Sequence, residues 1–193
     1  METKKAMQKG MALLLSTILM CCSDDDSMDN NFAQYTGNYD LVSFRSDMAV
    51  NLNGDGTITK ELLDEITTLG DLDLEIRPTL SQTNQVKLIS FFFPSSRVSF
   101  QYPGILEGSV EFFDYGFGTT YEFLDKNFHL MRYSYSEDLF VDNVQEKRSV
   151  FLDSHLSVKK NDQLGISISK EYYDFNTREW IRLNISVTYG KID

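Results

Sequence analysis

Apolar and polar residues alternate along most of the chain from about residue 36 onward. The clearest case runs from residue 180 to 189, where every second residue is apolar: Ile181, Leu183, Ile185, Val187 and Tyr189. Alternation with a period of two is typical of an antiparallel strand that buries one face. Shorter stretches of the same kind cover 97–102, 150–158 and 164–169, although the polar Ser154 interrupts the apolar face of the second. The pattern therefore predicts a protein built from strands.

We predict about nine or ten strands, at roughly 36–46, 72–78, 85–93, 96–102, 106–115, 118–124, 128–136 and 148–159, and a final hairpin of 163–175 with 178–190. Turn-forming residues separate several of them, at Asp125-Lys126-Asn127, Asn161-Asp162 and Asn176-Thr177. One short helix is predicted from Lys60 to Thr67, with Thr59 as its N-cap. Hairpins at this spacing predict an all-β fold, either an antiparallel up-and-down barrel or a closed sandwich.

The first 34 residues follow a different pattern. Lys4, Lys5 and Lys9 give a basic start, and the apolar stretch of residues 11–20 is too short to span a bilayer. A basic segment followed by a short apolar core is typical of a secretory signal. We therefore predict a signal peptide over 1–21, an acidic tether over 22–34 and a single folded domain over 35–193.

The end of this signal resembles the lipobox of bacterial lipoproteins, in which a cysteine is diacylated and becomes the mature N-terminus. Here Cys21 and Cys22 end the apolar run, and Ser23 and three aspartates follow. That acidic run resembles the surface-export tag of lipoproteins from the Bacteroidetes phylum, which directly follows the lipidated cysteine. The spacing favours Cys22 over Cys21. The alternative is an ordinary secreted protein with a disordered acidic linker.

The resemblance implies a lipid bilayer as partner through N-terminal acyl chains, and an outer-membrane location with exposure at the cell surface. Asp26-Ser27-Met28 is similar to the short O-glycosylation motif of the same phylum, which makes Ser27 a candidate for glycosylation.

Charge and cysteine content exclude several functions. The whole chain has a net charge of −11, and residues 1–21 contribute three lysines and one glutamate, so removing their +2 leaves −13. A nucleic-acid-binding protein would have the opposite balance. Both cysteines lie at the processing site. We therefore expect neither disulfides nor thiol chemistry in the folded domain.

Two segments near the start of the domain resemble lipocalin-like surface lipoproteins of the Bacteroidetes. Gly37-Asn38-Tyr39 resembles the G-x-W motif that opens such barrels, with Tyr39 in place of tryptophan. The segment 49–66 resembles an insert after their first strand, in which a D-L-N-G-D-G loop leads into a short helix. The resemblance implies a lipocalin-like barrel.

The loop 51–59 has the spacing of a calcium site. EF-hand loops place oxygen ligands at positions 1, 3, 5, 7 and 9, with glycine at 6 and glutamate at 12. Counted from Asn51, the candidate ligands are Asn51, Asn53, Asp55, Thr57 and Thr59, with Glu61 one residue before the expected glutamate. With Asp55 as the one certain anion, we expect weak calcium binding as the only cofactor. The alternative is a structural turn.

Aromatic residues are concentrated between 91 and 123, where they line either a packed core or a ligand cavity. The residues that we predict to line a cavity are Tyr39, Phe100, Tyr102, Phe112 and Phe123. In Phe91-Phe92-Phe93 both faces of the strand are apolar, so one of them has to be covered from outside or left on the surface.

Catalytic chemistry has little support in the sequence. His129 has no metal-ligating partner at a useful spacing, and His155 and its neighbour Ser154 are predicted to point to opposite faces of a strand. We expect both histidines to be solvated strand residues and the protein not to be an enzyme. The predicted role is non-catalytic binding of a small apolar or glycan ligand. The alternative is an accessory lipoprotein that docks an envelope or host protein through exposed aromatic residues.

Overall fold

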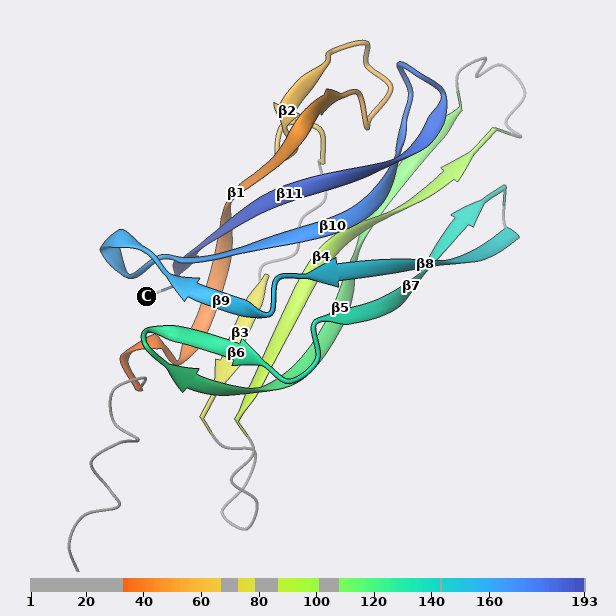
Figure 1. Ribbon diagram of the computed structural model, residues 1–193. Helices are drawn as coiled ribbons and strands as arrows, with labels where there is room; N and C mark the ends of the chain where they lie inside the picture. Colours follow the sequence, from red (N-terminus) through yellow and green to blue (C-terminus); the bar gives the residue numbers. More distant parts are fainter. Residues whose placement is uncertain (1–32, 67–72, 79–86, 101–107, 143, 193) are drawn as a thin grey trace, which may run out of the picture. The chain divides into compact units, whose positions relative to one another are not determined.

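The computed structural model describes residues 33–66, 73–78, 87–100, 108–142 and 144–192. The all-β prediction is confirmed (Figure 1). The strands are β1 (Gly37–Val50), β2 (Thr59–Glu61), β3 (Leu74–Arg77), β4 (Leu88–Ser99), β5 (Ser109–Leu124), β6 (Asn127–Leu130), β7 (Ser134–Val141), β8 (Val144–Leu152), β9 (His155–Val158), β10 (Leu164–Asp174) and β11 (Glu179–Lys191).

Eight of these strands close into an antiparallel barrel. Their order around the ring is β1, β3, β4, β5, β6, β9, β10 and β11, and β11 pairs with both β10 and β1. Each strand of the ring lies beside the ring strand that precedes it in the chain, which is the up-and-down arrangement that the regular hairpins predict. Pairing of Tyr39 with Lys191 brings the two ends of the domain together.

Three strands lie outside this ring. β2 pairs with β1, and the hairpin of β7 and β8 connects β10 to β4. β8 pairs with β10 only at Ile168 and Ser169, and β7 pairs with β4 only at Arg97 and Val98. The β7–β8 hairpin is therefore attached to the barrel by two short ladders.

Two pairs of predicted strands are single long strands in the structure. The segments 85–93 and 96–102 form β4, which runs through Pro94, and 106–115 and 118–124 form β5. Proline is tolerated at position 94 because its nitrogen lies on the edge of β4 that pairs with β3 at one end and with β7 at the other. On that edge Phe92 N donates to Asp73 O (2.9 Å) and Asp142 N donates to Val98 O (3.0 Å). Pro94 lies between them, in the gap between β3 and β7, where a missing N–H breaks no ladder.

Two other predicted strands are divided. The segment 128–136 becomes the end of β6 and the start of β7, and 148–159 becomes parts of β8 and β9 with a break at Asp153 and Ser154. Ser154 is the residue that interrupts the apolar alternation, so the break lies where burial of one continuous face fails. The predicted turns at 125–127 and 176–177 are present, and residues 161–162 lie in a short 3-10 helix, η2 (Lys160–Asp162). Asp125, Lys126 and Asn161 have the positive φ angles of tight turns.

The predicted helix from Lys60 is wrong over its described part. Residues 59–61 form β2 and residues 62–65 form a turn. Thr59 and Glu61 form a local contact in which Thr59 Oγ1 accepts a hydrogen bond from Glu61 N (3.0 Å). Leu62 N donates to Phe44 O (2.8 Å), which holds the segment against β1 as an added strand end. Pairing to the sheet thus overrides the local helix preference.

The barrel interior is filled mainly by apolar and aromatic side chains. Leu183, Ile185, Val187 and Tyr189 of β11 are fully buried, as their alternation predicts. On β4, Phe91 and Phe93 point inward and are buried, whereas Phe92 lies over Gly116 of the neighbouring strand. The outward face of the aromatic run is thus covered in part by its own sheet, and a covering helix is not needed there.

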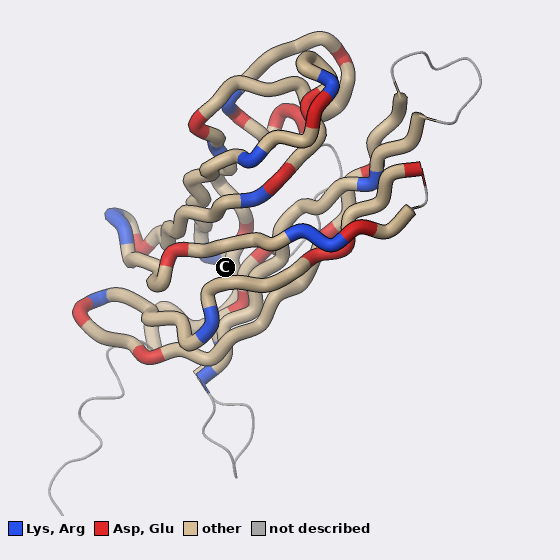
Figure 2. Tube along the Cα trace, turned by 45° about the vertical axis from the view of Figure 1, so that its right-hand side comes forward, with Lys and Arg blue, Asp and Glu red and all other residues tan. Residues whose placement is uncertain are grey.

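Acidic and basic residues are interspersed along the described strands (Figure 2). Several pair across the outer surface, including Arg148 with Glu146 and Glu171, and Arg182 with Glu171. Such exposed pairs contribute little to stability. Among the described residues, no helix has the length and apolar character needed to cross a membrane.

Candidate functional site

The loop 51–59 is held by hydrogen bonds from its own backbone. Asn51 Oδ1 accepts from Gly54 N (2.8 Å), Asn53 Oδ1 from Asp55 N (2.9 Å) and Asp55 Oδ1 from Thr57 N (2.7 Å). Asp55 Oδ2 accepts from the Asn53 amide (3.1 Å). The side-chain oxygens that would ligate calcium therefore already accept N–H donors, as in a stable turn.

Two residues outside the loop fasten it to the barrel. Glu65 Oε2 accepts from Leu52 N (2.9 Å) and Asn53 N (3.2 Å). Asp174 Oδ1 accepts from Asn51 N (2.9 Å). Burial raises the pKa of Asp174, but its hydrogen bonds together outweigh burial and leave that pKa below its usual value.

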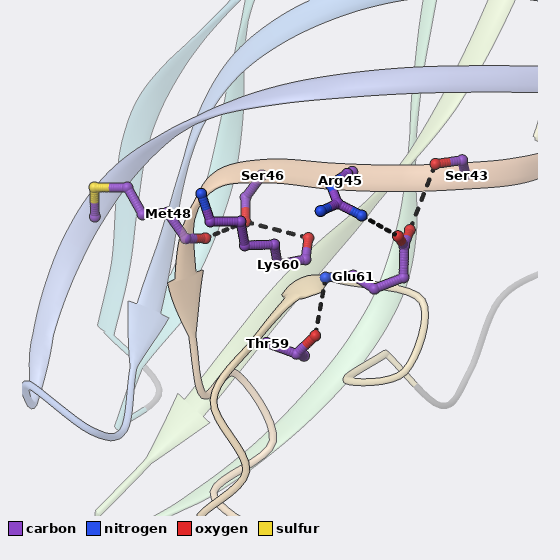
Figure 3. Close-up of polar contacts among 7 residues, drawn as sticks. All are labelled: Ser43, Arg45, Ser46, Met48, Thr59, Lys60 and Glu61. Carbon is purple, nitrogen blue, oxygen red and sulfur yellow. Dashed lines mark hydrogen bonds and ion pairs between the residues drawn. The ribbon is translucent and has the colours of Figure 1, made fainter.

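The glutamate that would complete the calcium site points away from the loop. Figure 3 shows the Glu61 carboxylate turned toward β1, where it accepts from Ser43 Oγ (3.4 Å) and Arg45 Nη1 (3.4 Å). Within the described ranges no three His, Cys, Asp or Glu side chains are grouped closely enough to hold a metal ion. Calcium binding at this loop stays a prediction, and it would require Asp55 to exchange its present donors for the ion.

The predicted cavity residues that the structure describes differ in burial, and two of them share the neighbour Tyr35. Tyr39 is fully buried and its hydroxyl donates to Tyr35 O (2.6 Å), while Phe123 contacts Tyr35 at a ring distance of 5.8 Å. Phe112 is 8% exposed, whereas Phe100 is 40% exposed and packs edge-on against Tyr173. Their role as the lining of a ligand cavity stays a prediction. Tyr102, Ser27, Cys21 and Cys22 lie outside the described residues.

A group of polar side chains lies inside the barrel, where the strand pattern predicts apolar residues. We call it the inner polar cluster: Ser95 of β4, Tyr135 and Glu137 of β7, Lys170 and Tyr172 of β10, and Tyr189 of β11. Its centre is an ion pair between Lys170 Nζ and Glu137 Oε2, in which both side chains are 0% exposed.

Burial dominates the electrostatics of this pair. It raises the pKa of Glu137 and lowers that of Lys170, and each partner offsets only part of the effect on the other. The Ser95 hydroxyl beside the carboxylate adds a further small decrease of the Glu137 pKa. Removing two charges from water costs several kcal/mol per ion, roughly, and the attraction between them compensates only in a well-bonded site. Two apolar side chains of similar volume would give the protein an equal or higher free energy of unfolding.

Tyr135 and Tyr172 lie close enough to Glu137 to be affected by its charge, and Tyr189 lies near Tyr135. The Tyr172 hydroxyl donates to Pro94 O, on the edge of β4 that lacks a strand partner. The hydroxyls of Tyr135 and Tyr189 are buried and make no hydrogen bond. Burial is the main cause that raises the pKa of Tyr135, and the Glu137 charge raises it further. Both hydroxyls therefore stay protonated at neutral pH and are available as donors.

An aromatic stack leads from the surface to the inner polar cluster. The half-exposed Tyr115 stacks on Tyr135 (5.5 Å between ring centroids), and Tyr135 stacks on Phe117 (4.8 Å). Phe117 stacks in turn on the fully buried Phe91 (6.4 Å). The Tyr135 ring is only half-buried while its hydroxyl is fully buried. This side chain thus connects the outer surface with the buried ion pair.

Comparison with models of known protein families, with curated proteins and with solved structures finds no match to this chain. The lipocalin-like resemblance therefore stays a prediction, while the eight-stranded barrel is a property of the structure.

The pattern of apolar and polar residues does not predict the inner polar cluster, although the sequence contains one signal for it. Lys170 follows Leu164, Ile166 and Ile168 in the inward phase of one alternating strand. A charged residue in the buried phase is rare unless it has a partner. That signal could have identified Lys170, but Glu137 lies on a distant strand and no local pattern pairs the two.

Proposed function

We propose that this protein is a surface-anchored lipoprotein that binds a small ligand, non-catalytically, within its β-barrel. The observation that carries the proposal is the inner polar cluster, in which a buried ion pair lies beside tyrosine hydroxyls without partners. A buried polar group without a hydrogen bond costs about 1–3 kcal/mol, so its retention calls for an explanation. A bound ligand with its own polar groups would supply the missing partners of Tyr135 and Tyr189.

The chemistry of the cluster favours the glycan class over a purely apolar ligand. Tyrosine hydroxyls donate hydrogen bonds, a carboxylate accepts them, and aromatic rings give flat apolar surfaces. A glycan offers hydroxyl groups that match the first two and ring faces that match the third. An alkyl chain would leave the hydroxyls of Tyr135 and Tyr189 without partners.

The β7–β8 hairpin provides a route into the barrel. It carries Tyr135 and Glu137, and its ladders to β4 and β10 each extend over only two paired positions. Opening of this hairpin would expose Lys170 without breaking the eight-stranded ring. Ligand uptake in this proposal therefore requires movement of one hairpin only.

Native mass spectrometry of the full chain, purified in detergent from its own host, tests the proposal. We expect a mass larger than that of the acylated chain by one ligand, with the ligand released on activation in the gas phase. The double variant Glu137→Leu with Lys170→Met removes the polar centre and should abolish the added mass. The variant Ile185→Val, at a fully buried apolar position of β11, should keep it.

The alternative function, docking of an envelope or host protein, has a separate observation in its favour. Tyr133 is 51% exposed and Phe151 is 49% exposed. They lie on adjacent chain segments, because Leu152 N donates to Tyr133 O (2.8 Å). A bare mass for the wild-type chain would argue against the carrier function and favour this one. Crosslinking on intact cells, compared between wild type and Phe151→Ser, would then identify the partner.

A further inference from the structure

The two histidines of this chain, 26 residues apart in sequence, lie side by side on the barrel. His129 of β6 pairs directly with His155 of β9. Leu130 N donates to Ser154 O (2.9 Å) and Val158 N donates to Lys126 O (3.1 Å), which makes the even-numbered positions of β6 the hydrogen-bonded ones. The His129–His155 pair is therefore a non-hydrogen-bonded pair, the type that brings opposite side chains closest.

Both imidazoles lie on the outer face. Phe128 and Leu130, the neighbours of His129 on β6, are buried, as is Leu156 beside His155. His155 is exposed and His129 is half-buried. The pair is therefore accessible to solutes without any opening of the barrel.

The distance between the rings matches a shared metal ion. Their centroids are 5.9 Å apart, and the planes are inclined by 37°. Two imidazoles that ligate one ion through nitrogens at about 2.0–2.1 Å have ring centroids roughly 5–6 Å apart. The observed spacing needs only small side-chain rotations to reach this arrangement.

A carboxylate and a hydroxyl flank the pair. Glu122 of β5 pairs with His129 on its other side, so Glu122, His129 and His155 form one row across three adjacent strands. The Ser154 hydroxyl lies 3.4 Å from His155 Nδ1, which leaves Nε2 of that ring to face an ion. Metal-ligating histidines commonly have such a contact at the second nitrogen.

We propose that His129 and His155 form a surface site for a divalent transition-metal ion such as Zn²⁺, with Glu122 as the neighbouring carboxylate ligand. Imidazole nitrogen suits Zn²⁺, Cu²⁺ and Ni²⁺, whereas calcium prefers oxygen ligands, so this site is chemically distinct from the loop 51–59. In the described part of the chain no three ligating side chains converge as they stand. Glu122 must therefore change rotamer to reach the ion, and water completes the coordination.

NMR of the full chain labelled with ¹⁵N-histidine, titrated with Zn²⁺ alone, tests the site. The chain contains only two histidines, so every imidazole signal belongs to the proposed site. We expect the ring nitrogen signals of His129 and His155 to shift together at one equivalent of Zn²⁺. Zinc bound at the loop 51–59 or at Cys21 and Cys22 would leave these signals unchanged, and that result would overturn the proposal.

Variants separate a shared site from two independent surface histidines. His155→Gln should weaken Zn²⁺ binding at His129 by more than tenfold, and Glu122→Gln should weaken it by about tenfold. Glu111→Gln, an exposed glutamate on the same strand, is the matched control and should change nothing. An unchanged affinity at His129 after His155→Gln would show that the two rings do not share an ion. The thermal unfolding midpoint of each variant checks that the barrel is intact.

Discussion

Lys170 has an environment that few lysines have. Its ammonium group is fully buried, pairs with Glu137 and lies 5.3 Å from the ring centroid of Tyr172. Glu137 is the charged group that offsets the effect of burial on this ammonium group. Breaking a buried ion pair by removal of one partner is far more harmful than removal of both, because the remaining charge has no counterion.

This asymmetry predicts the outcome of a double-mutant cycle. Lys170→Met alone should lower the free energy of unfolding by about 3–5 kcal/mol, because Glu137 is left buried without its cation. The double variant Lys170→Met with Glu137→Leu should recover most of that loss. Urea unfolding of the full chain measures the free energy of unfolding of the single and the double variant. A double variant as unstable as the single one would show that the pair is needed for the fold itself.

Asp73 makes the stability of the barrel depend on pH. It is 4% exposed, and its Oδ2 accepts from Leu41 N (2.6 Å) while its Oδ1 has no partner. Burial raises the pKa of Asp73 to about 6, against a smaller opposing effect of the Leu41 hydrogen bond. A carboxyl group whose pKa is raised by folding favours the folded state when protonated. The protonated Asp73 therefore contributes fully to the free energy of unfolding below its unfolded pKa of about 4. This contribution is lost as the pH rises through 6.

The variant Asp73→Asn should isolate this effect, because asparagine keeps an oxygen for Leu41 N but cannot ionise. Its unfolding free energy should equal that of the wild type below pH 4. Above pH 7 it should exceed the wild-type value by roughly 2–3 kcal/mol, since only the wild type then buries a charge. Urea unfolding at pH 3.5, 5.5 and 7.5 measures the difference. A difference that does not vary with pH would contradict the raised pKa.

The strands of the protein differ in how firmly they are attached. β10 and β11 pair at every position from Leu164–Tyr189 to Asp174–Glu179, and β11 also pairs with β1. The β7–β8 hairpin is well paired internally, from Ser134–Phe151 to Val141–Val144, but it meets β10 and β4 over two positions each. Elements with few tertiary hydrogen bonds open with lower free energies than the rest of a fold.

Hydrogen exchange should therefore divide the backbone amides of the strands into two groups. Amides of β7 and β8 should exchange with opening free energies several kcal/mol below those of β10 and β11, which we expect to exchange only by global unfolding. Mass spectrometry or NMR of the full chain at neutral pH resolves the two groups. Equal protection of both hairpins would argue against hairpin opening as the route to the inner polar cluster.

The whole molecule is organised by contacts between residues far apart in the chain. Closure of the barrel requires β1 and β11, from opposite ends of the domain, to pair along most of their lengths. Folds dominated by such non-local pairings fold slowly, in milliseconds to seconds. The net charge of −11 on the whole chain favours solubility, because copies of the protein repel one another.

Anchoring to a membrane is a prediction that also concerns the whole molecule, and the predicted lipobox makes it testable. Acyl chains contribute about 0.8 kcal/mol per buried CH₂, so the acylated protein should enter the detergent phase of a temperature-induced phase separation. Cys22→Ala should shift it to the aqueous phase, and Cys21→Ala should leave it in the detergent phase. The opposite result would assign the anchor to Cys21. Retention of both variants in the detergent phase would reject the lipobox interpretation.

The sequence by itself determined the fold class, the turns and the buried faces of the later strands. Residues such as Leu183, Ile185 and Val187 are buried where their alternation predicts, because a period of two assigns each side chain to one face of a strand. The sequence predicted the lengths of the strands less well. Pro94 does not end β4, since its effect depends on whether a neighbouring strand needs its N–H.

The tertiary structure alone decided which distant residues meet. Glu137 and Lys170 are 33 positions apart, and His129 and His155 have no metal-binding spacing in the sequence. His129 and His155 meet through the register of β6 and β9, whereas Glu137 and Lys170 meet from two strands, β7 and β10, that do not pair with each other. Neither arrangement is set by a local pattern in the sequence. The residue types that carry chemistry are therefore visible in the sequence, whereas the sites that they form exist only once the barrel has closed.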